Sequence, residues 1–209
     1  MRVHTQETQQ NLTPDLALEI LIDGNARFVS NIKEHRDLLE QVNKTSEGQF
    51  PFAAILSCID SRTSAELIFD QGLGDIFSIR IAGNILNDDI LGSMEFACKI
   101  AGSKLIVVLG HTKCGAVLGA CSDIKVENSK IPDLLSKIKP AIEQETETAA
   151  NRTAENKQFV TNVTRNNILR TVDQIRAQSK LLSEMEARAE IKIIGGLYDL
   201  DTGKVEFYR

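Results

Sequence analysis

The chain has 209 residues, of which 42% are hydrophobic and 25% charged, and its formal net charge is -5. A chain of this length can bury one sizeable core. No run of Lys and Arg stands out in it, so we expect no nucleic-acid partner. No apolar stretch approaches the roughly 20 residues of a membrane span, and the polar first residues carry no apolar signal core. We therefore expect a cytoplasmic protein with no membrane partner.

Residues 1–50 are predicted to form a helical arm outside the core sheet. Thr13 can cap a helix whose first turn holds Pro14. The stretch 31–49 is mostly polar and is predicted to contain a second helix and a connection. Residues 51–209 are predicted to form an α/β domain.

Beyond Phe52, short apolar runs alternate with helical patterns. Such alternation predicts a mostly parallel central sheet flanked by helices. The turn Asp201-Thr202-Gly203 predicts a C-terminal hairpin whose last strand lies at an edge of the sheet. The expected strands cover residues 52–57, 76–81, 105–109, 190–198 and 204–208.

Helices are expected between these strands, over residues 63–70, over residues 88–101 and after Cys114. Residues 131–157 are polar, contain no glycine and are also predicted to be helical. A later amphipathic helix is marked by Ile168, Val172, Ile175 and Leu182.

Two short motifs each follow an expected strand: Cys58-Ile59-Asp60-Ser61-Arg62 and His111-Thr112-Lys113-Cys114. Ligands of open α/β sheets bind beyond the carboxyl ends of strands, so both motifs are expected at one edge of the sheet. Of the three histidines, His111 alone follows a buried strand. Two thiols and one imidazole give zinc three protein ligands and leave a fourth position for water, as in catalytic sites. The sequence therefore predicts Zn²⁺ bound by Cys58, His111 and Cys114.

Asp60 and Arg62 are close enough in sequence to pair across a tight turn. Arg62 would supply a cation beside two thiolates and hold the carboxylate in a fixed pose. Asp60 could then accept a hydrogen bond from the water at the open position. Alternatively, Asp60 could itself bind the metal and close the site in a resting form.

The four cysteines need not form disulfides, because a reducing compartment keeps thiols free. Cys98 lies on an apolar helix face, and Cys121 follows Val117 and Leu118 at core spacing. Free cysteine is commonly buried as a small hydrophobic residue, so both are predicted to pack in the core.

The two motifs together resemble those of the β-class carbonic anhydrases. Further similarity covers Gly74–Phe77, Arg80–Asn84 and the last hairpin, so the resemblance runs from about residue 14 to the end. Two departures stand beside it: Ile81 follows Arg80 where many members have Asn, and Gln71 is offset by one place from a glutamine of plant-like members. The residues that carry the two motifs are Cys58, Asp60, Ser61 and Arg62 in C-x-D-S-R, and His111, Cys114 and Gly115 in H-x-x-C-G.

This resemblance implies a zinc enzyme that reversibly hydrates CO₂ to bicarbonate and a proton by metal-hydroxide attack. It implies that Asp60 and Arg62 form a catalytic dyad, and that the backbone amide of Gly115 lies near the substrate. It also implies a homodimer, or a tetramer built from dimers, in which the N-terminal helices embrace a neighbouring subunit.

Two other functions are compatible with the same residues. One is a hydrolase of CS₂ or COS on the same scaffold, which differs in access to the pocket. The other is a zinc-stabilised binding protein without turnover. A fourth permanent protein ligand would favour this alternative, and Asp60 is the only evident candidate.

Overall fold

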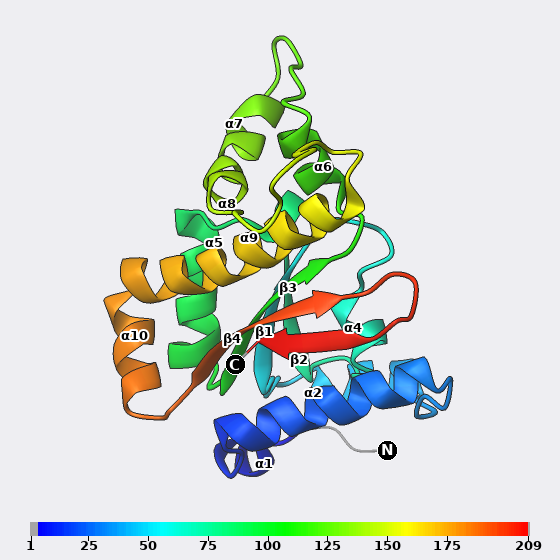
Figure 1. Ribbon diagram of the computed structural model, residues 1–209. Coiled ribbons are helices and arrows are strands. Elements are labelled where there is room, and N and C mark those ends of the chain that lie inside the picture. The colour runs from blue at the N-terminus through cyan, green and yellow to red at the C-terminus, as the bar shows by residue number, and fades with distance from the viewer. Residues whose placement is uncertain (1–3, 209) are drawn as a thin grey trace.

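The computed structural model describes residues 4–208 and contains a five-stranded sheet with helices on both faces (Figure 1). The strand order is β2-β1-β3-β4-β5. The first four strands run parallel, and β5 pairs antiparallel with β4 at the edge. The predicted fold class, with its C-terminal edge hairpin, is confirmed. The strands are β1 (Ala53–Ser57), β2 (Ile76–Arg80), β3 (Leu105–His111), β4 (Lys192–Tyr198) and β5 (Val205–Tyr208).

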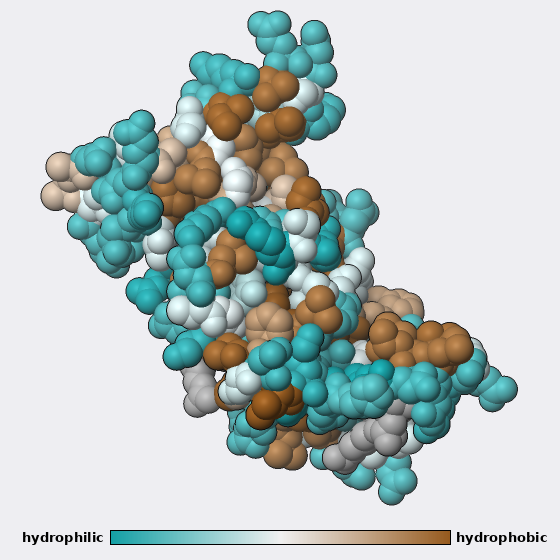
Figure 2. Space-filling view, turned by 90° about the vertical axis from the view of Figure 1, so that its right-hand side faces the viewer, coloured by the Kyte–Doolittle hydropathy of each residue, from teal (hydrophilic) through white to brown (hydrophobic). Residues whose placement is uncertain are grey.

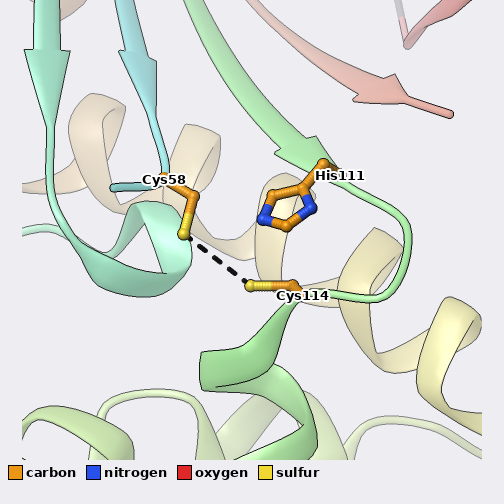
Figure 3. Close-up of side chains that lie close together, drawn as sticks. All are labelled: Cys58, His111 and Cys114. Atoms are coloured by element: carbon orange, nitrogen blue, oxygen red, sulfur yellow. Dashed lines mark hydrogen bonds between the residues drawn. The ribbon is translucent and has the colours of Figure 1, made fainter. Parts of the chain in front are cut away.

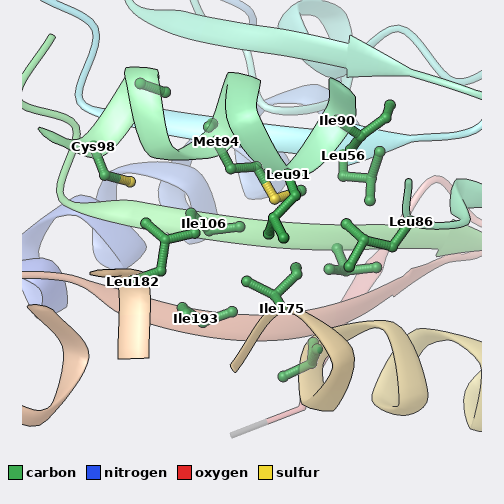
Figure 4. Close-up of a cluster of buried hydrophobic side chains, with 14 of the residues drawn as sticks. Leu56, Leu86, Ile90, Leu91, Met94, Cys98, Ile106, Ile175, Leu182 and Ile193 are labelled. Carbon is green, nitrogen blue, oxygen red and sulfur yellow. The ribbon is translucent and has the colours of Figure 1, made fainter. Parts of the chain in front are cut away.

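The two central strands, β1 and β3, are buried along their whole length. Successive side chains of a strand point to opposite faces, so each of these apolar runs serves two core layers. Leu56 and Ile106 pack on one face with α5 (Asp88–Glu95), α9 (Lys157–Gln178) and α10 (Lys180–Ala187), as Figure 4 shows. The other face packs against α2 (Pro14–Val29) and α4 (Ala65–Ile68).

The N-terminal residues contact their own chain. One face of α2 is buried against the sheet through Ala17, Leu18 and Leu21. The short helix α1 (Gln6–Gln10) is fixed by Gln9, whose Nε2 donates to Pro51 O and Ala101 O at 2.7 Å each. The second expected helix of this region is α3 (Leu38–Thr45). The boundary at residue 50 and a subunit contact through this arm stay predictions.

The helices between the strands differ in detail from those that the sequence predicts. The helix expected over residues 63–70 is only α4, and α5 passes into a π-helical turn, η2 (Phe96–Ile100). A one-turn 3-10 helix, η1 (Ala82–Asn84), follows β2, and α6 (Gly115–Cys121) follows Cys114 as expected. The expected helix around Ile168 is divided, because Ser179 ends α9 and caps α10 through its hydroxyl.

The prediction that residues 131–157 are helical is correct for only part of this stretch. Two short helices, α7 (Ile131–Ser136) and α8 (Lys139–Glu143), each begin with a proline in the first turn, and residues 144–156 are not helical. Proline disrupts a helix interior but fits its first turn, which explains the division. The buried Glu145 carboxylate accepts bonds from Thr148, Arg152 and Asn162 and so organises the loop.

An ion-pair cluster around Asp70 holds the segment after α2 on the core. Its carboxylate is 2% exposed and accepts from Arg27 Nε at 2.6 Å and Arg36 Nη1 at 2.5 Å. Glu34 donates its backbone N–H to the same carboxylate. Burial opposes the charge, but the bonds from Arg27, Glu34 and Arg36 outweigh it and lower the pKa of Asp70.

We expect Asp70→Asn to destabilise the protein at neutral pH. A carboxylate whose pKa is lowered on folding stabilises above the ordinary pKa of about 3.9 and loses this contribution as pH falls through the folded value. The difference in urea midpoint between wild type and Asp70→Asn should therefore be full at pH 7 and shrink below about pH 4. Asp133→Asn, at a 74% exposed side chain, is the control without effect. An undiminished difference at acid pH would refute the electrostatic reading.

Two helix-interior glycines are expected to respond oppositely to alanine. A Cβ at Gly24 in α2 would lie 1.8 Å from Phe69 O, a backbone atom that cannot yield cheaply. A Cβ at Gly92 in α5 would meet nothing of the described chain within 4 Å. We expect Gly24→Ala to lower the free energy of unfolding by about 2–3 kcal/mol. Gly92→Ala should raise it by about 0.5–1 kcal/mol, because alanine favours the helix. Urea unfolding of both variants checks this, and equal effects would contradict it.

Candidate metal centre and active site

The three predicted metal ligands lie at the carboxyl ends of the two central strands (Figure 3). Cys58 directly follows β1, and His111 is the last residue of β3. Cys114 is the N-cap of α6, which the chain reaches through a turn with Lys113 at φ 58°. Because β1 and β3 are parallel neighbours, their ends bring residues 58 and 111 together. All three side chains are buried.

The ligand atoms of Cys58, His111 and Cys114 all lie within 4.8 Å of one another. The two Sγ atoms are 3.9 Å apart. Two thiolates on one tetrahedral zinc ion, each at about 2.3 Å, would be about 3.8 Å apart, so the sulfur positions fit this metal.

The orientation of His111 also fits a metal site. Its Nδ1 lies 2.9 Å from Thr112 O, so an Nδ1–H donates to that carbonyl. The lone pair of Nε2 is then free to bind a metal. Nε2 is buried and has no hydrogen-bond partner within residues 4–208. A buried nitrogen of this kind needs a partner, and a metal ion supplies one.

The two thiols differ in acidity. Hydrogen bonding from the Cys114 thiol lowers the pKa of Cys58 against the effect of burial, and the Gly83 amide lowers it further. The resulting thiolate, together with burial, raises the pKa of Cys114 far above its usual range. Within the pair, the thiolate is therefore favoured at Cys58 and the thiol at Cys114. Binding of zinc by both sulfurs must release the proton of Cys114.

Asp60 and Arg62 form a two-pronged ion pair beside these ligands. Arg62 Nε donates to Asp60 Oδ1 at 2.9 Å, and Nη2 donates to Oδ2 at 2.7 Å. The Arg62 backbone N–H also donates to Oδ1 at 2.9 Å. These bonds hold the pKa of Asp60 well below its usual range. Asp60 Oδ2 lies 3.9 Å from His111 Nε2, which places the carboxylate at the edge of the ligand cluster.

Arg80 and Gly83 contribute to the site in ways that the sequence analysis missed. Arg80 Nε donates to Cys58 O at 3.0 Å, and its Nη2 donates to Asp60 O at 2.6 Å. The Gly83 N–H donates to Cys58 Sγ at 3.4 Å. Their place in the chain could have indicated this role: β2 lies beside β1, so residues at or just past the end of β2 reach the loop after β1.

A cavity of about 570 Å³ opens beside the ligands, and Cys58, Asp60 and Gly115 line it. Its remaining wall is mostly apolar and includes Ile124 and Leu134. In Figure 2, apolar side chains gather at the height of α6 and α7. A Cβ at Gly115 would meet nothing of the described chain within 4 Å, so the backbone there is open to an occupant.

The family model described as carbonic anhydrase matches residues 53–205, which include all three ligands. The chain belongs to the β-class carbonic anhydrases. It is similar to carbonic anhydrase 2 of Mycobacterium tuberculosis, with 35% identity over 198 residues that cover 93% of this chain and 92% of the relative.

Solved structures agree with this assignment. The β-carbonic anhydrase CcaA has a TM-score of 0.70 and 25% identity, over 92% of this chain and 95% of that one. One of two tetrameric β-carbonic anhydrases from Sordaria macrospora has a TM-score of 0.68 and 22% identity, over 79% of this chain and 84% of that one. The latter supports the fold alone.

This carbonic anhydrase has the zinc-binding Cys-His-Cys set of its family. It catalyses the family's reaction, the reversible hydration of CO₂. The predicted family, cofactor and activity are confirmed. The individual roles of Asp60, Arg62 and Gly115 stay predictions. Across residues 4–208, no helix is both long and apolar enough to span a membrane.

Proposed function

We propose that Asp60 and Arg62 act as the catalytic dyad of CO₂ hydration, beside zinc held by Cys58, His111 and Cys114. Bound zinc lowers the pKa of a water ligand and so makes hydroxide available near neutral pH. The observation that carries the proposal is the Asp60 carboxylate, which is fixed by Arg62 with Oδ2 at 3.9 Å from His111 Nε2. In that position the Asp60 carboxylate could accept a hydrogen bond from the water ligand and orient it.

The charge balance of the site favours an Asp60 that is not bound to the metal. Two thiolates already cancel the charge of Zn²⁺, so a third anion on the metal would bring net negative charge into a buried site. Both Asp60 oxygens are engaged by Arg62. To close the site as a ligand, Asp60 would have to give up these charge-assisted bonds. The dyad therefore favours an open resting form, in which Arg62 also offsets the negative charge that develops during the reaction.

The cavity supports CO₂ as the substrate. Its apolar wall suits a small molecule without net charge, and its polar residues lie at the metal end. Gly115 is the first residue of α6, so its N–H has no partner within the helix. We propose that this amide donates to a substrate oxygen. A side chain at position 115 would enter the same space.

Stopped-flow CO₂ hydration with zinc quantified in the same samples tests the function. We expect a rate that rises in proportion to bound zinc, and little release of sulfide from CS₂ or COS. Turnover of CS₂ or COS in place of CO₂ would contradict the proposal. Zinc binding without any turnover would support the alternative of a non-catalytic binding protein.

We also propose that the chain forms a homodimer, or a tetramer built from dimers, with residues 1–50 as a contact arm. The exposed side chain of Phe96 lies beside the free edge strand β2. Ile100 is also exposed, and Leu39 is 71% exposed on α3. Unpaired edges and apolar patches favour association. Light scattering of the purified protein would give the mass, and a monomer at micromolar concentration would contradict this.

The thiol ligands favour a reducing compartment such as the cytoplasm.

A further inference from the structure

A second cavity lies where α5, α8 and α9 meet, on elements that adjoin one another in Figure 1. Its volume is about 290 Å³. None of its lining residues lines the cavity beside the metal ligands. Polar and charged side chains contribute much of the wall, among them Asn87, Asp88, Lys137, Arg170, Thr171 and Gln174.

Arg170 is the feature of this cavity that the fold leaves unexplained. Its Nε is buried without a hydrogen-bond partner, and the guanidinium forms no ion pair with any group of residues 4–208. The acid nearest along the helix, Asp173, pairs instead with Arg176 at 3.6 Å. A buried donor without an acceptor costs stability, so native structures usually satisfy it with a ligand, an ion or water.

A second cation and the N-terminus of a helix also lie at this cavity. Lys137 Nζ has one long bond, 3.4 Å to Leu86 O, and is otherwise free to turn inward. The eight-residue helix α5 begins here, and the side chain of its cap, Asn87, accepts from the Ile90 N–H. The amides of the first helical turn point toward the cavity end and favour negative charge. Asp88 is the one acidic side chain in the lining, and it is exposed.

We propose that this cavity binds a small oxyanion of the phosphate class. Arg170 would donate paired bonds to two of its oxygens, and Lys137 would supply the second positive charge. Two cations against one exposed carboxylate leave a net positive site. The volume admits the anion together with water or a small ester substituent.

Isothermal titration of the zinc-loaded enzyme with inorganic phosphate, at constant ionic strength, tests the proposal. We expect saturable binding that Arg170→Gln and Lys137→Gln each weaken about tenfold, because each removes a charge-assisted bond. Lys130→Gln, at a 96% exposed side chain, is the charge-matched control and should bind as wild type does. The CO₂ hydration rate without phosphate should be unchanged in all three variants.

Phosphate that binds at the metal would be unaffected by these variants, so equal affinity in wild type and variants overturns the proposal. Absence of saturable binding in the wild type overturns it as well. If Arg170→Gln changes the subunit number by light scattering, Arg170 serves a subunit contact and the anion site is refuted. Lys137 is exposed, so its variant reports on binding even where Arg170→Gln unfolds.

Discussion

Cys58→Ser is expected to strip zinc from the protein and to reduce CO₂ hydration at least ~10³-fold, because the hydroxyl is not ionised at neutral pH and binds zinc poorly. The loss should be complete in practice, since His111 and Cys114 alone cannot retain the ion against buffer. Zinc content by mass spectrometry and stopped-flow hydration measure the two effects together.

Cys121→Ser is the matched control for this loss. Cys121 is only partly buried at the end of α6, and burial raises its pKa to about 11, so it remains a neutral thiol. We expect this variant to keep one zinc ion per chain and full activity. Retention of stoichiometric zinc by Cys58→Ser would refute the assigned ligand set.

Asp60→Ala is expected to lower the turnover number by about 10²–10³ while zinc content stays unchanged, because an oriented acceptor contributes on this scale. Asp60 Oδ2 lies 3.9 Å from His111 Nε2, beyond bonding distance, so its removal should leave the three metal ligands in place. Zinc quantification beside steady-state kinetics separates this result from that of Cys58→Ser.

Arg62→Lys and Asp60→Asn refine the test. A lysine keeps the charge but cannot form the two parallel bonds that Arg62 makes, so we expect intermediate activity. Asp60→Asn keeps the shape and loses the charge, so we expect it to be nearly as slow as Asp60→Ala. Full activity in Asp60→Ala would disprove the dyad, and zinc loss would show that Asp60 is a ligand.

The parts that the sequence predicted well depend on strongly local signals. Continuous apolar runs over β1 and β3 identify strands that are buried on both faces, and their order places Cys58 and His111 together. The Cys114 position follows from the short turn after β3. These local signals are enough to identify the ligand set from the sequence alone.

The parts that were missed depend on contacts between distant residues. Glu145 organises a loop through Asn162 and Arg152, and polar composition alone does not separate such a loop from a helix. Arg80 reaches the carbonyls of Cys58 and Asp60 only because β2 lies beside β1. Arg170, whose buried Nε has no hydrogen-bond partner within residues 4–208, is recognised only once α5, α8 and α9 are assembled around the cavity.

The three ligands differ in how firmly the backbone holds them. Cys58 follows β1 and His111 ends β3, and these two interior strands, buried along their whole length, should be among the slowest in amide hydrogen exchange. Cys114 is carried by a turn whose Lys113 adopts a left-handed conformation. Removal of zinc by a chelator should therefore begin with release of the Cys114 sulfur, at a rate set by opening of that turn and not by unfolding of the domain.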